Sequence, residues 1–532
     1  MPERERRWNG WGFAGESFPV PAAARAWLAE RLGPGDPLGA TAEGEFPVPP
    51  PRPLPALPAP TMTSPAERLR AACGHSLPDL LALRTGTIAA FPDAVCLPES
   101  SEQVVEVLKA ASASGVTVIP RGGGTSVVGG VTVRPGARPV VVLSLERLRG
   151  LVRVDATSRL ATFRAGTLGP EVEAALAPHG LRLGHEPQSF ELSTVGGWVA
   201  TRSAGHRSTG VGKIDELVAG VEVATPAGLW QLPAQPASAA GPELRRLVVG
   251  SEGRLGVITE ATLRVRPLPE CEDGLAVLMP GWASGVDACR ELLQAEIPLE
   301  VLRLSDACES SFGTTLVSLP PLAARVSRAL FSLRRYRQGC LLLLGWAGGA
   351  QEATLGRQAA ARVWRAAGGL ALGQSGWRRW RAERFRHPYL RDELLSEGWG
   401  VDTLETAAPW ATLGTVYSAV REAMKGSGVR VAILCHLSHA YRDGASLYFT
   451  FLWPLAHGAE LAQWGALKRA ATEALLTAGG TLSHHHGVGT IHAPYLAREV
   501  GRTGVAALST LAQEIDPQGV LNPGVLLPEG GR

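Results

Sequence analysis

The sequence predicts an α+β protein made of two mixed domains and a helical C-terminal segment. Three observations lead to this prediction. Short β runs alternate with helical stretches over residues 91–268, and a second mixture of helices and isolated β runs covers residues 269–455. An Ala- and Leu-rich helix follows at residues 458–478. At 532 residues, the chain is long enough for two or three domains with cores of their own.

Residues 1–90 are predicted to be an N-terminal extension. Residues 7–13 (RWNGWGF) are aromatic and interrupted by Gly, and residues 47–65 are rich in Pro. Because Pro cannot donate a backbone hydrogen bond, we expect this stretch to run as an extended linker. A short helix is predicted over residues 69–83.

Turn signals separate the elements of the first mixed domain, residues 91–268. Helices are predicted at residues 104–114 and 169–179, and residues 225–228 (TPAG) predict a hairpin turn. The predicted strands are residues 116–120, 140–145, 152–154, 161–164, 217–224, 229–231 and 257–267.

The second mixed domain covers residues 269–455. Its clearest β runs are residues 341–346, 429–436 and 446–453. Residues 456–532 are predicted to form a C-terminal helical segment that carries a His-rich loop and ends in a turn-rich tail.

Composition excludes several classes of protein. A net charge of +3, spread along the chain, does not indicate a nucleic-acid partner. Seven Cys without a CxxC pair indicate reduced thiols and a cytoplasmic location. No stretch approaches the ~18–20 apolar residues of a spanning helix, and residues 1–10 do not resemble a secretory signal. The richness in Ala, Arg and Gly is typical of a bacterial protein from a GC-rich genome.

Three Gly-rich segments in the first domain indicate a bound nucleotide. They are residues 120–126 (PRGGGTS), 186–201 and 250–258 (GSEGRLGVI). Gly lets backbone N–H groups converge on an anion without a Cβ in the way. The first segment alone could be a surface turn, and its spacing is neither that of a P-loop nor that of a Rossmann site. Three such segments exceed what turns require, so we expect a long diphosphate-containing nucleotide.

Three consecutive imidazoles, His484, His485 and His486, lie between the C-terminal helix and a Gly-rich turn. Such a cluster suits proton transfer or the binding of an anion or a metal. A zinc site is the rival interpretation, but the HxxxH and HExxH spacings are missing, so no metal is predicted. In an extended segment neighbouring side chains point apart, so at least one of the three is expected to be non-catalytic.

The Gly-rich segments resemble a known class of flavin domain. PRGGGTS, EPQSFELSTVGGW and GSEGRLGVITEA are similar to the FAD-binding domain of the vanillyl-alcohol oxidase / p-cresol methylhydroxylase (PCMH) superfamily. RWNGWGF, YLRDE, ETAAPW and SHHHGVG are more specific, and resemble the alkyldihydroxyacetonephosphate synthase (alkylglycerone-phosphate synthase) family of ether lipid synthesis. The resemblance runs from Arg7 to Asn522.

This resemblance implies a fold and a cofactor. The fold would be a two-subdomain PCMH-type FAD-binding domain, a cap domain and a C-terminal segment that returns to the flavin. No His or Cys stands in the loop where some relatives attach flavin, so FAD is expected to be non-covalent. The residues expected to bind FAD are Pro120, Arg121, Gly122, Gly123, Gly124, Thr125, Ser126, Gln188, Ser189, Ser193, Thr194, Gly196, Gly197, Thr201, Arg202, Ser203, Ala204, Glu252, Gly253, Gly256, Val257 and Ile258.

The resemblance also implies a reaction. In the family, the acyl group of acyl-dihydroxyacetone phosphate is exchanged for a long-chain alcohol through an adduct on flavin N5, without net redox change. The substrates are therefore small lipid molecules. The alternative is an FAD-linked oxidase or dehydrogenase of a D-2-hydroxy acid or an alcohol, and a non-enzymatic flavin-fold protein is a third.

Motif matches assign roles to single residues. Arg391 would bind the substrate phosphate through its planar guanidinium, with Arg303 as a further substrate-binding residue. Tyr448 would donate or accept a proton, which for a phenol of pKa about 10 needs a cationic or hydrogen-bonded setting. His484, His485, His486 and His185 complete the expected catalytic set. Structural alternatives are a surface ion pair for Arg391 and a plain strand aromatic for Tyr448.

A basic stretch with interleaved aromatics covers residues 377–386 (WRRWRAERFR). The ordinary interpretation is a solvated helix face. The sharper hypothesis is a patch that contacts anionic headgroups at the inner face of a membrane, where long-chain substrates would enter. The sequence leaves a homodimer open.

Overall fold

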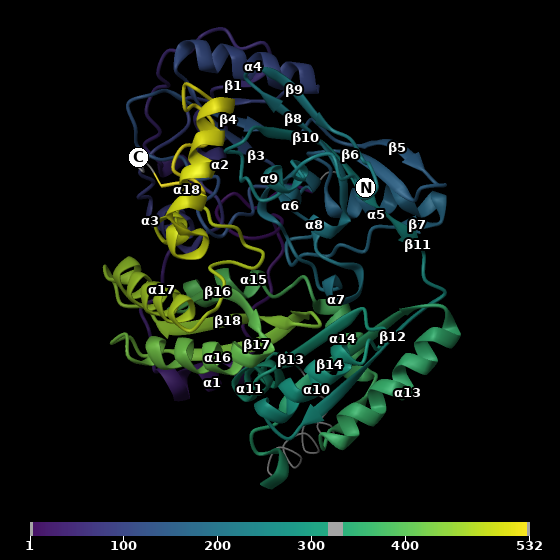
Figure 1. Cartoon of the computed structure of the whole chain (residues 1–532). Helices are drawn as coiled ribbons and strands as arrows, with labels where there is room; N and C mark the ends of the chain where they lie inside the picture. The colour runs from purple at the N-terminus through teal and green to yellow at the C-terminus, as the bar shows by residue number, and fades with distance from the viewer. Residues whose placement is uncertain (1–3, 318–333, 529–532) are drawn as a thin grey trace.

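The computed structural model describes residues 4–317 and 334–528. Three large sheets, one two-stranded sheet and the helices around them form two domains in the described residues (Figure 1). We call the part that holds the four- and five-stranded sheets the first domain, and the part that holds the seven-stranded sheet the second domain. The mixed α+β class predicted from the sequence is confirmed.

The four-stranded sheet of the first domain has the order β1-β2-β4-β3. Strands β2, β4 and β3 are parallel, and β1 pairs with β2 in the antiparallel sense. Helix α4 packs between this sheet and the five-stranded sheet, because its row of Val and Leu side chains is buried on both. The elements are β1 (Thr61–Met62), β2 (Ala94–Cys96), α4 (Ser101–Ser114), β3 (Thr117–Arg121) and β4 (Val140–Ser144).

The five-stranded sheet is antiparallel throughout, in the order β5-β6-β10-β8-β9. The hairpin predicted at residues 225–228 joins β8 to β9. The strands are β5 (Leu151–Asp155), β6 (Leu160–Arg164), β8 (Val218–Thr225), β9 (Gly228–Leu232) and β10 (Val257–Arg264), with the small pair β7 (Leu181–Arg182) and β11 (Arg266–Pro267) beside them. The helices are α5 (Gly169–Leu176), α6 (Val195–Thr201), α7 (Ser208–Val211), α8 (Ile214–Leu217) and α9 (Arg245–Val248).

The second domain is a seven-stranded antiparallel sheet in the order β15-β12-β14-β13-β17-β18-β16. Helices of the main core cover one face of it, and the other face is partly covered by further helices and otherwise turned toward the first domain (Figure 1). The strands are β12 (Cys271–Met279), β13 (Val301–Ser305), β14 (Cys340–Gly348), β15 (Leu370–Gly373), β16 (Trp399–Pro409), β17 (Ala432–Ala440) and β18 (Gly444–Pro454). The helices are α10 (Trp282–Gln294), α11 (Ala307–Thr315), α13 (Ala350–Ala366), α14 (Ser375–Glu383), α15 (Tyr389–Ser396) and α16 (Trp410–Lys425).

The N-terminal segment is woven into both domains. Helix α1 (Ala22–Leu32) packs on α11 of the second domain, where Trp27 Nε1 donates to Ser311 Oγ at 3.1 Å. The single helix predicted over residues 69–83 is wrong, because the chain forms α2 (Pro65–Ala72) and α3 (Leu77–Thr85) instead. Ser76 caps α3 and exchanges hydrogen bonds with Asp79, a capping box that starts a new helix.

The C-terminal segment crosses from one domain to the other. Helix α17 (Glu460–Thr477) packs one face into the core of the second domain. Helix α18 (Leu496–Ile515, yellow in Figure 1) packs against Leu255 of the first domain, and Leu521 forms a parallel bridge with Val118 of β3. The His-rich loop, residues 483–489, lies in this crossing.

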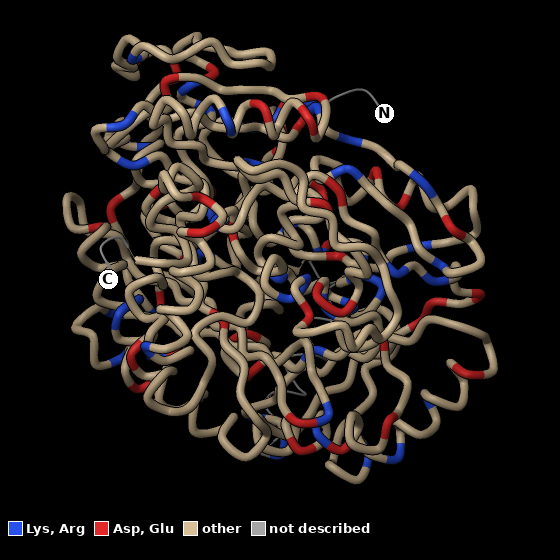
Figure 2. The backbone as a smooth tube through the Cα atoms, turned by 45° about the horizontal axis from the view of Figure 1, so that its top comes forward, with Lys and Arg blue, Asp and Glu red and all other residues tan. Residues whose placement is uncertain are grey.

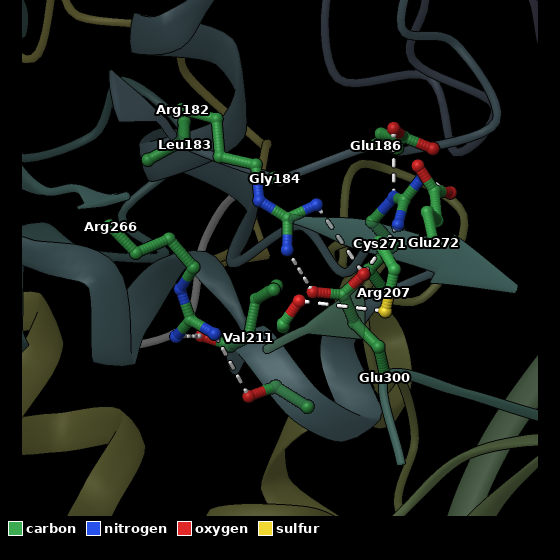
Figure 3. A network of polar contacts seen from close by, with 12 residues as sticks. Arg182, Leu183, Gly184, Glu186, Arg207, Val211, Arg266, Cys271, Glu272 and Glu300 are labelled. Carbon is green, nitrogen blue, oxygen red and sulfur yellow. Dashed lines mark hydrogen bonds and ion pairs between the residues drawn. The ribbon is translucent and has the colours of Figure 1, made fainter. Parts of the chain in front are cut away.

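A buried ion network also joins the two domains (Figure 3). Arg207, which precedes α7, pairs with Glu186 of the first domain at 2.9 Å and with Glu272 and Glu300 of the second. Glu300 pairs with Arg182 as well. Burial alone would lower the pKa of Arg207, but the three carboxylates raise it above its ordinary value. The guanidinium is therefore charged at any physiological pH.

Elsewhere, acidic and basic residues are interspersed over the backbone (Figure 2). Within residues 4–317 and 334–528, no helix is both long and apolar enough to span a bilayer.

Candidate active site

A cavity of about 410 Å³ lies between the two domains. This volume is typical of small-molecule and cofactor sites. The first domain contributes the Gly-rich loops to its wall, and the second contributes the open face of the seven-stranded sheet.

The first Gly-rich loop follows β3 and reaches the cavity at residues 122–126. A Cβ on Gly123 would lie 2.0 Å from the Leu192 carbonyl oxygen, and Gly124 has φ +69°, so Gly is needed at both positions. Among the residues that the structure describes, the backbone N–H groups of residues 122–125 have no protein acceptor. A run of free donors in a tight loop fits a diphosphate, as FAD requires.

Most residues expected to bind FAD line this cavity. The second Gly-rich segment meets the first directly, because a Cβ on Gly122 would lie 2.3 Å from Thr194 Oγ1. The expected residues found in the wall are Pro120, Arg121, Gly122, Gly123, Gly124, Thr125, Ser126, Gln188, Ser189, Ser193, Thr194, Gly196, Gly197, Thr201, Ser203, Ala204, Glu252, Gly253, Gly256, Val257 and Ile258.

Arg202 is the exception among them. It ends α6 in the left-handed conformation, with φ +54°, and its guanidinium pairs with Asp215 at 3.0 Å. The Arg202 side chain is not part of the cavity wall, although residues 203–206 directly after it are, so a cofactor contact at Arg202 is not supported by this position.

Strand alternation builds the second-domain wall. In β13, β16, β17 and β18, every second side chain packs against the helices, and the others point to the cavity. Glu405 is opposite Tyr448, and Tyr448 is opposite His436, so one cross-strand row holds all three. Arg303 enters the same face from β13.

The His-rich loop is held by one buried carboxylate. Glu405, 2% exposed, accepts from the backbone N–H groups of His484, His485 and His486 at 2.6, 3.1 and 2.9 Å. It also accepts from Ser483 Oγ at 2.7 Å. Burial would raise the pKa of Glu405, but the imidazoles and the N–H donors hold it well below its usual range.

The three imidazoles do not alternate as in the extended segment assumed from the sequence, because the loop is curved around Glu405. His485 and His486 line the cavity, whereas the His484 ring points away and its Nε2 forms a 2.7 Å hydrogen bond with the Tyr441 hydroxyl. Burial lowers the pKa of each of the three rings below its ordinary value. They are therefore neutral at physiological pH, and each neutral ring has one nitrogen that can accept a hydrogen bond.

Tyr448 lies between imidazoles on the cavity wall. Its ring stacks on His436 with centroids 4.9 Å apart and lies 5.5 Å from His486, edge to face. Burial raises the pKa of Tyr448 to about 12, the opposite of the shift that a phenolate base would need. At rest the group is a neutral phenol and a proton donor.

The two expected substrate arginines differ in their partners. Arg303 is already paired with Glu309 at 2.7 Å and contacts the His436 ring. Arg391, on α15, donates from Nη1 to the His75 carbonyl at 2.8 Å. Its Nε and Nη2 atoms are buried and have no hydrogen-bond partner among the described residues.

The neighbouring carboxylate of Asp392 makes no hydrogen bond to Arg391, although its charge favours the charged guanidinium. Asp392 instead accepts from the Trp11 backbone N–H at 2.6 Å. The structural alternative for Arg391, a surface ion pair, is therefore not what the structure has.

His185 does not reach the cavity. It is fully buried in the first domain, against the Trp198 ring, and its Nε2 lies 3.1 Å from Ser203 Oγ. Burial lowers the pKa of His185 to about 3. Its expected catalytic role is not supported by this position, because core packing accounts for the residue.

Sequence reasoning missed four histidines of the cavity wall, His206, His387, His436 and His439. Simple alternation would point His439 away from His436, but the β17–β18 register shifts between Ser438 and Ala440. His439 is the extra residue of this bulge, with φ +45°, and its ring stacks on His484. His436 was detectable, because polar residues interrupt an otherwise apolar strand there.

Glu405, His484 and His485 also place three potential metal-ligand atoms within 4.8 Å of one another. However, Oε1 of Glu405 already accepts three hydrogen bonds and Oε2 accepts one. The arrangement is explained as a hydrogen-bonded clamp, and the absence of a metal remains a prediction.

Comparisons with known proteins agree with this geometry. Residues 92–231 match the family model of the FAD binding domain, and residues 268–526 match that of the C-terminal domain of FAD linked oxidases.

Similar curated proteins include two alkyldihydroxyacetonephosphate synthases. The chain is 32% identical to that of Dictyostelium discoideum, over 86% of this chain and 76% of the relative. It is 31% identical to that of Trypanosoma brucei brucei, over 87% and 77%.

Solved structures give the same result. An alkyldihydroxyacetonephosphate synthase structure superposes with a TM-score of 0.84 at 27% identity, covering 97% of this chain and 98% of the other. A substrate-bound p-cresol methylhydroxylase has a TM-score of 0.67 at 13% identity, covering 88% and 94%, and shows a shared fold alone.

Proposed function

The chain belongs to the alkyldihydroxyacetonephosphate synthase family, and we propose that it exchanges the acyl group of acyl-dihydroxyacetone phosphate for a long-chain alcohol. The protein is an FAD-dependent enzyme. Both predictions from the sequence, the family and the cofactor, are confirmed.

The unpaired guanidinium of Arg391 is the observation that carries this proposal. A buried cation with two free donors in one plane is costly unless an anion completes it. Two parallel N–H donors match two oxygens of a phosphate group. The position on the cavity wall makes that phosphate part of a bound small molecule.

An apolar arm of the same cavity fits the long chain. Its wall combines the strand residues Val401, Leu434 and Leu452 with Phe312, Leu316 and Leu394, which lie on or directly after the helices packed on them. One cavity thus offers an anion site, an apolar channel and proton-handling groups, which together suit a phosphorylated lipid and not a short hydroxy acid.

Each polar group has a role in this scheme. When bound, FAD supplies an electrophilic centre that side chains lack. His485 and His486 are neutral and can accept hydrogen bonds from a reacting group, and the Tyr448 phenol donates a proton to a departing or arriving oxygen. Arg391 holds the phosphate so that the reacting carbons stay near these groups.

Arg391→Ala tests the proposal in an exchange assay with acyl-dihydroxyacetone phosphate and hexadecanol. We expect KM for the phosphate substrate to rise roughly 10- to 100-fold, because a charge-assisted pair is lost, while FAD stays bound. Arg378→Ala, on the exposed face of α14, is the matched control and should leave KM unchanged. An unchanged KM in Arg391→Ala would remove this residue from the substrate site.

A redox function is the rival proposal. An FAD-linked oxidoreductase of Escherichia coli, YgcU, is 26% identical over 85% of this chain. Anaerobic mixing with D-2-hydroxy acids separates the two, because a dehydrogenase bleaches its flavin. Bleaching without acyl exchange would overturn the synthase proposal.

Membrane contact and cellular location remain proposals, as do a bacterial source and a homodimer. On α14, Trp377 is buried against Gly274 and Gly345, and Arg379 and Arg381 pair with acidic neighbours. The exposed Arg378 and Arg386 are the groups left for anionic headgroups. Flotation with anionic vesicles, compared with the Arg378→Glu/Arg386→Glu double variant, tests this contact.

A further inference from the structure

Glu405 lies beside the cavity but not in its wall. The cavity wall includes its cross-strand partner Tyr448 and its hydrogen-bond partners His485 and His486. Because the Glu405 side chain faces the loop and not the cavity, any effect on the reaction must pass through the residues that it holds.

The four hydrogen bonds to Glu405 converge from consecutive residues. Three successive backbone N–H groups, from residues 484–486, and the Ser483 hydroxyl point at one carboxylate. Backbone N–H groups converge in this way only in a tightly curved segment. In that curve, the His484 ring turns toward Tyr441, and the other two rings turn toward Tyr448.

The first domain holds the other end of the loop. Glu252 accepts from the backbone N–H groups of Val488 and Gly489 at 2.7 and 2.8 Å. Lys213 donates to the His484 carbonyl. Gly489 has φ +56°, and a Cβ there would lie 2.0 Å from the Val128 carbonyl oxygen. The loop is thus fixed at both ends, with Glu405 as the contact from the second domain.

We propose that Glu405 is a positioning residue of the exchange reaction, and that its carboxylate fixes the backbone of residues 483–486 so that His485 and His486 face the cavity beside Tyr448. This role rests on the proposed function. The role requires a carboxylate, because both of its oxygens accept hydrogen bonds. A Gln side chain of the same shape has one acceptor oxygen, and its N–H₂ group would face the N–H donors of the loop.

Glu405→Gln in the FAD-bound full chain is the test. We expect kcat to fall about 100-fold, because proton transfer depends on ring placement to within about 1 Å. KM for acyl-dihydroxyacetone phosphate should stay within about threefold, since Arg391 is untouched. Hydrogen exchange followed by mass spectrometry should show faster exchange at residues 483–489.

Glu499→Gln is the matched control. Glu499 is an exposed carboxylate that accepts from the Leu482 backbone N–H at 2.9 Å and from Thr481 Oγ1 at 2.7 Å, just before the loop. Its loss should leave kcat and the exchange of residues 483–489 within about twofold of the wild type.

Three outcomes overturn the proposal: a kcat of Glu405→Gln within about threefold of wild type, a raised KM at unchanged kcat, or a stoichiometric metal in the wild type that Glu405→Gln loses.

If Glu405→Gln loses FAD, Ser483→Ala is the second variant, because it removes one donor and keeps the charge. Unchanged exchange at residues 484–486 in that variant would also overturn it. If the wild type lacks exchange activity, the proposed function fails separately, because hydrogen exchange still reports whether Glu405 holds the loop.

Discussion

Two buried charges, Arg207 and Glu405, stabilise the region between the two domains in opposite ways. Arg207 is one cation among three carboxylates from distant parts of the chain (Figure 3). Glu405 is one anion that accepts from four consecutive residues. The first arrangement joins surfaces, and the second shapes a loop. Loss of Arg207 should therefore affect stability, and changes around Glu405 should affect turnover.

The largest expected effect is on turnover, in Tyr448→Phe. The variant keeps the stacked ring and loses the proton that the phenol holds up to a pH of about 12. We expect kcat to fall about 10²- to 10⁴-fold, with FAD and thermal stability unchanged.

Tyr441→Phe is the matched control for that variant. It removes a hydroxyl that also contacts the His-rich loop, at His484, but lies outside the cavity wall. Its kcat should change less than about fivefold. Equal losses in both variants would mean that the hydroxyls support the loop and not the proton transfer.

Arg207→Ala should give the largest loss of stability. The variant leaves Glu186, Glu272 and Glu300 buried without the cation that they share. Because removing one partner of a buried pair typically costs about 3–5 kcal/mol, we expect the free energy of unfolding to fall by that amount. Urea unfolding measures it, and the kcat of the folded fraction should stay near that of the wild type.

Arg182→Ala sharpens this result. Arg182 pairs with Glu300 alone in that network, so its loss should cost less than that of Arg207. A folded Arg207→Ala protein with normal stability and reduced kcat would contradict the division of roles.

Acid should destabilise the protein through two buried histidines, His185 and His492, before it affects the arginine network. Burial lowers the pKa of His185 and of His492 to about 3, from an ordinary value of 6.5. Below pH 6.5 the unfolded chain binds protons that the folded protein does not, so stability is full above that pH and is lost as the pH falls toward 3.

The expected loss is roughly 1–2 kcal/mol per histidine between pH 6.5 and 5. Urea midpoints at pH 7.5 and 5.5 measure it, and His185→Gln should flatten the difference by one histidine's share. An identical pH difference in the variant would show that His185 is not the neutral group inferred from its burial.

Much of this fold could be predicted from the sequence, because its signals are local. The predicted helix at residues 104–114 is α4, and the predicted strands at residues 140–145 and 446–453 are β4 and β18. The Gly-rich segments were detectable because only Gly tolerates the close approach at Gly123. Strands β13 and β16 were not predicted, because polar and apolar residues mix on the face that lines the cavity, which is neither core nor solvent.

By itself, the sequence determined the family, the cofactor, the nucleotide loops and the presence of an imidazole cluster, since each depends on residue types at short spacing. Tertiary structure alone decided which groups meet. A bulge brings His439 to the wall, a helix end turns Arg202 away, and the core encloses His185. It also places Glu405 beside a loop about 80 residues further along the chain. Contacts across such separations depend on how sheets pack, and periodicity along the chain carries no information about them.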